Sequence, residues 1–271
     1  MSTALVLAGG GVTGIAWEIG VLHGLKENGL DVPASAGLVV GTSAGSTVGA
    51  QLTTGHSLES LFARQLDDNH GEISPRIDVE LLTRIFGIMT DGASRSDDDR
   101  RRIGELALGA PTVDEATRRA VIENRIGTDD WPVTDLVITS IDAASGEFVT
   151  WTRSSGISLV DAVASSCAVP GVWPCVTING RRYYDGGLRN SANAFLAAGH
   201  DTVWVLAPLT GGASPAVEAE MEELRANGAT VHFVTADDEA TAAMGPNSLD
   251  PRFRRAAAEH GRRQGLAVRQ G

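Results

Sequence analysis

The fold of this chain is constrained most by two strand–turn–helix units. In each unit an apolar strand is followed by a glycine turn and then by a helix. Residues 3–8 (TALVLA) and 37–41 (GLVVG) are short apolar runs, as in buried parallel strands. Each run is followed by a helical pattern, over residues 15–29 and 43–52. Consecutive strand–helix units at this spacing predict right-handed crossovers and a parallel sheet.

The rest of the chain adds strands to this sheet and a helical stretch between them. Further strand patterns lie at 133–142, 147–152, 175–178, 181–184, 202–208 and 230–235. Residues 56–130 have a helical pattern, which we interpret as a helical cap or insertion, and residues 250–271 predict a C-terminal helix. The sequence therefore predicts a three-layer α/β/α fold with a mostly parallel central sheet, in a single domain over residues 1–271.

The composition excludes several classes of protein. The 271 residues include 22 Lys and Arg against 34 Asp and Glu, and a net charge of −12 argues against nucleic-acid binding. No run approaches the ~20 apolar residues of a transmembrane helix, and no basic segment marks a signal peptide. The two cysteines, Cys167 and Cys175, have no metal-binding spacing. We expect a cytoplasmic protein without a metal site, with peripheral membrane contact open.

The second strand ends in GTSAG, residues Gly41 to Gly45, which has the form G-x-S-x-G. In a nucleophile elbow the serine lies on a tight turn between strand and helix, and the glycines allow close packing. Ser43 is therefore a candidate nucleophile at the start of a helix. The alternative is that Ser43 is an ordinary N-cap residue.

A serine nucleophile needs a base, and the histidines fit that role poorly. None of them lies in a convincing loop after a late strand, so we expect structural or exposed roles for His23, His56, His70, His200, His232 and His260. An alternative base is Asp185, which begins Asp185-Gly186-Gly187. The preceding Asn179-Gly180 predicts a two-residue hairpin turn, which places Asp185 at a strand end.

The first glycine turn has two interpretations. Gly9, Gly11 and Gly14 satisfy G-x-G-x-x-G, which binds a dinucleotide pyrophosphate at a helix start. A dinucleotide-binding fold also has an acidic residue at the end of the second strand, where this chain has Ser43. The same backbone N–H groups can instead stabilise a transient oxyanion.

Together these motifs resemble the patatin-like phospholipases, a family of serine acyl hydrolases that use a Ser–Asp dyad. The matching segments, in family order, are Gly9-Gly10-Gly11-Val12-Thr13-Gly14, Gly41-Thr42-Ser43-Ala44-Gly45, Ala164 to Pro174 and Asp185-Gly186-Gly187. The chain departs from the family at Thr13, where an Arg or Lys is usual.

The resemblance implies a carboxylic ester hydrolase that cleaves lipid or fatty-acyl esters, of the phospholipase A, lysophospholipase or esterase type. Ser43 would be the nucleophile and Asp185 the base, and the N–H groups of Gly10, Gly11 and Val12 would form the oxyanion hole. Gly9, Gly14, Gly41, Gly45, Gly186 and Gly187 would shape these turns. No cofactor is implied. The alternatives are a non-catalytic lipid-binding or scaffold module of the same fold and, less favoured, a dinucleotide-binding enzyme.

Two further patterns have a structural and a functional interpretation. The apolar stripe from Val79 to Met89 fits core packing, an acyl pocket or a membrane-facing surface, and core packing is favoured. The C-terminal arginines fit either a solvated helix face, which is favoured, or contact with anionic headgroups. These arginines are Arg252, Arg254, Arg255, Arg262 and Arg263.

Overall fold

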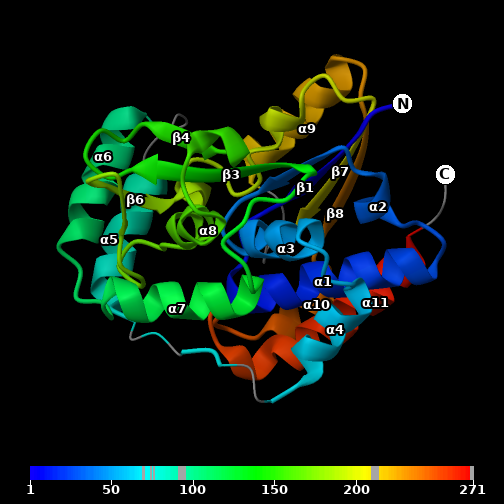
Figure 1. Cartoon of the computed structure of the whole chain (residues 1–271), viewed down its shortest axis with the longest axis horizontal. Coiled ribbons are helices and arrows are strands. Elements are labelled where there is room, and N and C mark those ends of the chain that lie inside the picture. The colour runs from blue at the N-terminus through cyan, green and yellow to red at the C-terminus, as the bar shows by residue number, and fades with distance from the viewer. Residues whose placement is uncertain (69–70, 74, 76, 91–95, 209–213, 269–271) are drawn as a thin grey trace.

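The fold is built on one sheet whose strands follow the apolar runs of the sequence (Figure 1). The computed structural model describes residues 1–268 apart from 69–70, 74, 76, 91–95 and 209–213. Within these residues the strands are β1 (Thr3–Leu7), β2 (Leu38–Gly41), β3 (Asp135–Asp142), β4 (Phe148–Trp151), β5 (Val176–Ile178), β6 (Arg181–Asp185), β7 (Thr202–Ala207) and β8 (Thr230–Thr235).

The central strands of the sheet are parallel, as predicted. The strand order is β5-β6-β3-β2-β1-β7-β8, and the five strands from β3 to β8 in this order all run parallel to their neighbours. β4 pairs antiparallel with β3, and the β5–β6 hairpin is antiparallel both internally and to β3. Asn179 and Gly180 both have positive φ, 49° and 78°, as the predicted hairpin turn requires.

Helices cover both faces of this sheet. They are α1 (Gly11–Glu27), α2 (Val32–Ser35), α3 (Ala44–Thr53), α4 (Leu58–Leu66), α5 (Val79–Thr90), α6 (Asp97–Leu108), α7 (Glu115–Ile126), α8 (Leu159–Ser166), α9 (Pro215–Ala226), α10 (Asp238–Met244) and α11 (Arg254–Ala267). The four helices α4 to α7 fall within residues 56–130, where a helical pattern was predicted. Short 3₁₀ turns include η2 (Gly186–Leu188) and η3 (Ala194–Ala197).

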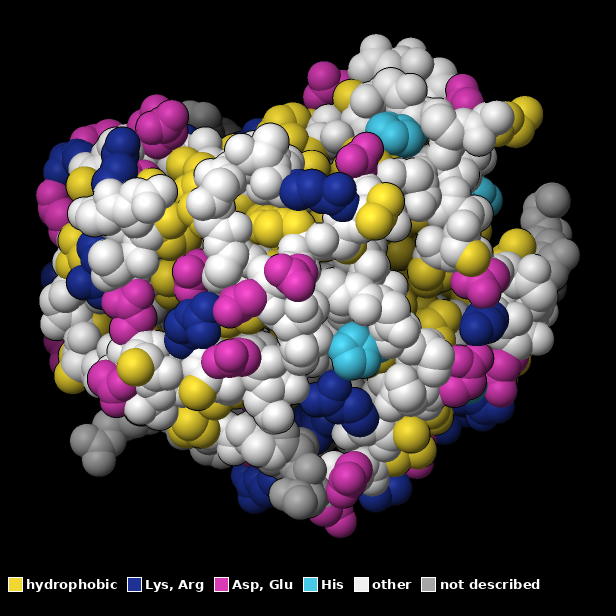
Figure 2. Space-filling view, viewed as in Figure 1, with side chains coloured by type: hydrophobic (Ala, Val, Ile, Leu, Met, Phe, Trp, Pro, Cys, Tyr) yellow, Lys and Arg dark blue, Asp and Glu magenta, His cyan; other side chains and the backbone are white. Residues whose placement is uncertain are grey.

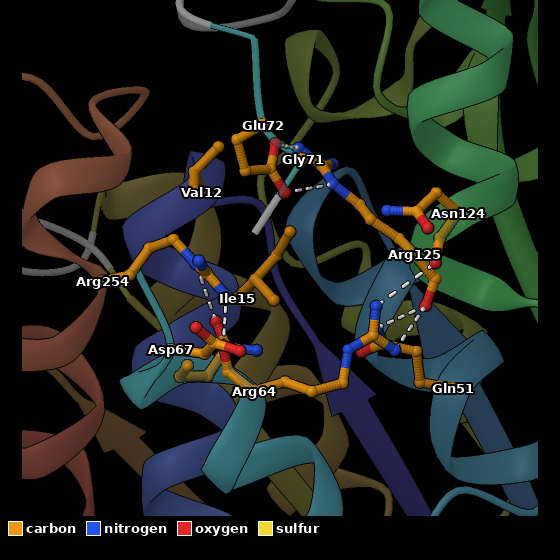
Figure 3. Close-up of a pocket in the computed structure, with 11 residues that line it drawn as sticks. Val12, Ile15, Gln51, Arg64, Asp67, Gly71, Glu72, Asn124, Arg125 and Arg254 are labelled. Atoms are coloured by element: carbon orange, nitrogen blue, oxygen red, sulfur yellow. Dashed lines mark hydrogen bonds and ion pairs between the residues drawn. The ribbon is translucent and has the colours of Figure 1, made fainter. Parts of the chain in front are cut away.

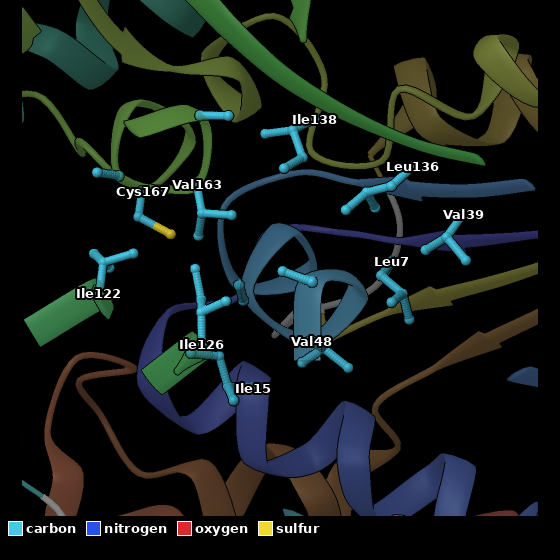
Figure 4. Close-up of a cluster of buried hydrophobic side chains, with 14 of the residues drawn as sticks. Leu7, Ile15, Val39, Val48, Ile122, Ile126, Leu136, Ile138, Val163 and Cys167 are labelled. Carbon is cyan, nitrogen blue, oxygen red and sulfur yellow. The ribbon is translucent and has the colours of Figure 1, made fainter. Parts of the chain in front are cut away.

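Alternate residues of each strand enter two separate hydrophobic clusters. Leu5 and Leu7 of β1 pack in the larger cluster, with side chains of α1, α3, α7 and α8. Figure 4 shows this cluster between the strands and those helices. Ala4 and Val6 point the other way, into a smaller cluster with α9 and η3. The two clusters make the fold three-layered, which confirms the predicted α/β/α class.

Glycines bring α1 and α11 into direct backbone contact. A Cβ on Gly20 would lie 2.2 Å from the Ala258 carbonyl oxygen, and one on Gly265 would lie 2.2 Å from that of Val21. Side chains at these positions would therefore force the helices apart. Because α11 covers its outer side, α1 is buried almost all round.

The first helix begins earlier than the sequence pattern predicted. α1 starts at Gly11 instead of Ile15, because the glycine turn itself forms the first helical turn. The N–H of Gly14 donates to the Gly10 carbonyl at 2.9 Å. The amides of the glycine turn are thus the amino-terminal amides of a long helix.

The apolar stripe on α5 is divided between core and surface. Ile85 is buried, and Leu81, Ile88 and Met89 pack against the core. Phe86 is 54% exposed. Figure 2 shows acidic side chains scattered among basic and apolar ones over one face of the molecule. None of the helices in the described part of the chain has the length and apolar character needed to cross a membrane.

Candidate active site

Ser43 lies on the sharp turn between β2 and α3. Its backbone has φ 52° and ψ −113°, a conformation that residues with a side chain rarely adopt. Its N–H donates to Ser166 Oγ at 2.9 Å, and its carbonyl accepts from Ser46 Oγ at 2.6 Å. Its own side chain makes no capping hydrogen bond to α3. Ser43 does occupy the N-cap position of α3, as the alternative expected, but its hydroxyl has no capping role.

The two glycines of the elbow are required by close packing. A Cβ on Gly41 would lie 2.6 Å from the Cα of Ser46, and one on Gly45 would lie 2.0 Å from the Leu7 carbonyl oxygen. Any side chain at Gly45 would therefore separate α3 from β1.

Asp185 lies at the same end of the sheet as Ser43, although its strand, β6, runs antiparallel to β3. Gly41, the last residue of β2, lies beside Ile138, while Asp185 pairs with Ser140 farther along β3. β4 pairs with one edge of β3. β2 and β6 therefore share the other edge, and β6 pairs there beyond the point where β2 ends. The sequence predicted a strand end for Asp185, and the extension of β3 past β2 places that end beside Ser43.

The Asp185 carboxyl is buried and holds its proton more tightly than usual. Burial raises the pKa of Asp185 from 3.8 to about 7, although hydrogen bonds from the Ser43 side chain and the Gly187 N–H oppose this rise. The Gly187 N–H donates to Oδ1 at 2.8 Å. A Cβ on Gly186 would lie 2.3 Å from Thr139 Oγ1, so this turn is also closely packed.

A buried polar network joins the serine turn to the Asp185 turn. Thr42 Oγ1 lies 2.8 Å from Thr139 Oγ1 and accepts a hydrogen bond from Asn193 Nδ2 at 3.1 Å. Asn193 also donates to the Asn190 carbonyl at 2.7 Å, and its backbone has φ 51°. Sequence reasoning missed Asn193 because no pattern connects it to Ser43, 150 residues earlier in the chain. Its hydrogen bond to Thr42 is apparent only from the folded structure.

The glycine turn faces Ser43, but its members are not equivalent. Gly9 lies closest to the serine: a Cβ there would contact Ser43 Cβ at 3.5 Å. Gly11 has φ 65° and, with Val12, lines the same cavity as Ser43. Gly10 lies under Pro208, whose Cγ would be 2.3 Å from an added Cβ. Of the three predicted oxyanion residues, Gly11 and Val12 are among the residues that line the cavity at Ser43, and Gly10 is not.

A cavity of about 20 Å³ lies at Ser43, which is room for about one water molecule. Its remaining wall is largely apolar and includes part of the 164–174 segment. The residues that line it are Gly11, Val12, Ile15, Ser43, Ala44, Arg118, Arg125, Cys167, Val169, Trp173 and Leu249. Neither arginine was singled out from the sequence, because α7 carries no motif.

The described histidines and Thr13, for which the sequence predicted no catalytic role, do not line this cavity. Among the described histidines, none lines it; His56 contacts the Ile126 carbonyl at 2.9 Å, and His232 stacks on Trp204. His70 lies outside the described residues. Thr13 is fully buried, and its N–H donates to the Ser248 carbonyl at 3.0 Å. The described residues contain no cluster of His, Cys, Asp or Glu side chains that could hold a metal ion.

Chemically, the arrangement supplies a hydroxyl on a strained backbone turn, a carboxyl with a pKa of about 7 and amide groups at the start of a helix. A hydroxyl next to such a carboxyl can pass on its proton near neutral pH. Helix-start amides stabilise negative charge. These are the requirements of acyl transfer.

The sequence between residues 5 and 198 matches the family model of the patatin-like phospholipases. The fold is similar to the crystal structure of VipD from Legionella pneumophila, with a TM-score of 0.51 at 15% identity over 98% of this chain and 66% of VipD. The type III effector ExoU matches at a TM-score of 0.39 and 14% identity, over 98% of this chain and 54% of ExoU. The chain thus spans less than two thirds of the length of either protein. No curated protein matches it in sequence. Since the family match covers most of the chain, and its motifs meet at one end of the sheet, the chain belongs to the patatin-like phospholipase family.

Proposed function

We propose that the protein is a serine acyl hydrolase that cleaves lipid or fatty-acyl esters, with Ser43 as nucleophile and Asp185 as base. The observation that carries this proposal is the strained Ser43 turn beside a buried Asp185 whose pKa is about 7. An ordinary surface serine and aspartate have neither property. Family membership supports the same class of reaction.

In the first half of the reaction, Asp185 accepts the proton of Ser43 Oγ as the oxygen attacks the ester carbonyl. The tetrahedral oxyanion is stabilised by the N–H groups of Gly11 and Val12, with Gly10 as a third candidate. The Ser43 N–H cannot contribute in the same way, because it donates to Ser166. Asp185 then gives its proton to the departing alkoxide.

In the second half, water replaces the alcohol. Asp185 accepts a proton from the water as it attacks the acyl-serine, and Ser43 recovers the proton when the fatty acid leaves. The pKa of about 7 suits both duties, because the group exchanges protons readily near neutral pH.

The cellular setting stays a prediction from the sequence. We propose a cytoplasmic enzyme that meets its lipid substrate during transient contact with a membrane surface. Phe86, exposed on α5, offers one apolar contact point for such a surface.

Hydrolysis of a neutral ester, such as a p-nitrophenyl fatty-acyl ester, tests the proposed chemistry. We expect Ser43→Ala to lower kcat at least ~10³-fold and Asp185→Asn to lower it strongly. Ser154→Ala, at an exposed serine, is the control and should behave like the wild type. A folded wild type that hydrolyses no ester would favour the non-catalytic lipid-binding alternative. Full activity in Ser43→Ala would exclude the dyad.

A further inference from the structure

Three buried arginines lie next to the candidate active site. Arg118 and Arg125 belong to α7, and Arg254 begins α11; they are 4%, 6% and 6% exposed. Figure 3 shows Arg125 and Arg254 reaching from opposite sides toward a cavity in front of Val12 and Ile15. This cavity has a volume of about 380 Å³. We call it, together with the three arginines, the arginine pocket.

The arginine pocket adjoins the Ser43 cavity. Val12, Ile15 and Arg125 line both spaces, and Arg118 lines the Ser43 side. A group bound in the pocket would therefore lie next to an ester held at Ser43. At about 380 Å³ the space falls within the range of small-molecule sites.

The pocket carries more positive than negative charge. Glu72 accepts from Arg125 Nε at 2.9 Å and also attracts Arg118 and Arg254. Among the described residues, its charged members are Arg64, Arg118, Arg125 and Arg254, against Asp67 and Glu72. In a chain with a net charge of −12, this excess of buried positive charge is a local property of the pocket. Buried charge without a counter-charge is strongly destabilising, so a bound anion would relieve it.

Two of the arginines have donors without a protein partner. Within the described residues, Arg118 Nε and Nη1 and Arg254 Nη1 are buried and make no hydrogen bond. The guanidinium of Arg118 stacks on Trp173, with its central carbon 3.8 Å from the ring centroid. Stacking fixes the plane of the guanidinium group but provides no hydrogen-bond acceptor for the N–H donors on its edge. Burial, and then Arg125, lower the pKa of Arg118 to about 9, so the group stays charged at neutral pH.

We infer that the arginine pocket binds a phosphate group carried by the ester that is cleaved at Ser43, with Arg254 as a donor from the larger cavity and Arg118 as a donor from the adjoining Ser43 cavity. This inference rests on the proposed function and adds a binding site to it. Guanidinium groups present paired N–H donors that match the oxygen atoms of a phosphate. Thr13, the glycine-turn residue where a cation was expected, is neutral, so α7 and α11 supply the positive charge instead.

Two substrates that differ in one group test the inference. The purified full chain is assayed for fatty-acid release from a 1-acylglycerol 3-phosphate and from the 1-acylglycerol with the same acyl chain. We expect the wild type to prefer the phosphate ester at least ~10-fold in kcat/KM. Arg118→Gln and Arg254→Gln should each reduce that preference to no more than ~2-fold, chiefly through KM, because each removes charged hydrogen bonds.

Matched variants separate binding from folding. Arg263→Gln removes an exposed arginine on the same helix as Arg254 and should keep the wild-type preference. Arg118→Lys keeps the charge but loses the planar fork, so it should recover only part of the preference if Arg118→Gln folds poorly. Equal kcat/KM for the two esters in the wild type, or an unchanged preference in both glutamine variants, would overturn the inference.

Inorganic phosphate distinguishes the two sources of the anion. We expect it to inhibit hydrolysis of the phosphate ester in competition with that substrate and to raise the Tm of the wild type more than that of Arg118→Gln. Inhibition by phosphate without any preference for the phosphate ester would mean that the pocket binds free phosphate, and our assignment would be wrong. If the neutral ester is cleaved through Ser43 in that case, the proposed function still stands. If neither ester is cleaved, both proposals fail.

Discussion

Ionisation of Asp185 controls both activity and stability in this account, and replacing it with asparagine separates the two effects. The carboxyl is 3% exposed, and burial raises its pKa from 3.8 to about 7. Below pH 7 the base is largely protonated and cannot accept the Ser43 proton. We therefore expect kcat/KM to fall about tenfold for each pH unit below 7 and to level off above it.

The same pKa fixes the sign of the stability effect. Because the pKa is raised in the folded state, ionisation of Asp185 opposes folding: its contribution to stability is fully present below pH 3.8 and is lost as pH rises through about 7. The rise from 3.8 to about 7 corresponds to about 4 kcal/mol, at roughly 1.4 kcal/mol per pKa unit. Asp185→Asn has no such ionisation. It should exceed the wild type in unfolding free energy by up to about 4 kcal/mol at pH 8.

Two assays test this prediction on the same samples. Ester hydrolysis from pH 5 to 8.5 gives the pKa of the base, and urea unfolding at pH 5 and 8 gives the stability gap between wild type and Asp185→Asn. Asp130→Asn, at an exposed aspartate, is the control for loss of a surface carboxyl and should keep the wild-type kcat/KM. A flat kcat/KM profile, or a limb near pH 4, would refute the role of Asp185. A stability gap that is equal at both pH values would refute the burial argument.

Three further substitutions test a hydrogen bond near the site, the packing of α1 against α11 and the burial of a carboxyl on α1. Asn193→Ala removes the hydrogen bond to Thr42 and should lower stability by about 1–3 kcal/mol and also lower kcat; unchanged Tm and kcat would contradict its positioning role. Gly265→Ala places a Cβ 2.2 Å from a carbonyl oxygen of α1 and should cost about 1–3 kcal/mol in urea unfolding, unlike Gly87→Ala, whose Cβ meets no atom of the described residues within 4 Å. Burial raises the pKa of Glu18, so the Tm of Glu18→Gln should exceed that of the wild type by a margin that grows from pH 5 to pH 8. A margin that shrinks with pH would show that Glu18 is stabilised as the carboxylate.

Local patterns were enough to predict the sheet and the turns. Apolar runs located the strands, and the GTSAG turn located Ser43, because each signal lies within a few consecutive residues. The backbone at Ser43 and the close packing of Gly41 and Gly45 agree with the elbow that the motif predicted. The strand–helix spacing predicted that the central strands are parallel, but not their order in the sheet.

Contacts between distant segments were beyond sequence reasoning. Arg254 was assigned to a solvated helix face, but this prediction was wrong, because α11 packs over α1 and α4 and buries its first residue. The periodicity of a helix does not reveal that two of its neighbours will enclose it. Arg118 was missed for a related reason: only the packing of α7 brings its guanidinium over Trp173 and beside Ser43.

The most direct test of the central claim is covalent labelling of the intact protein with a fluorophosphonate at pH 8, followed by peptide mass spectrometry. The probe reacts with a serine that is activated as a nucleophile, whatever the natural substrate. We predict one modified site, Ser43, in the wild type and in Ser154→Ala, and no modification in Ser43→Ala. Labelling at a different serine, or equal labelling of Ser43→Ala, would contradict the assignment of Ser43 as the nucleophile.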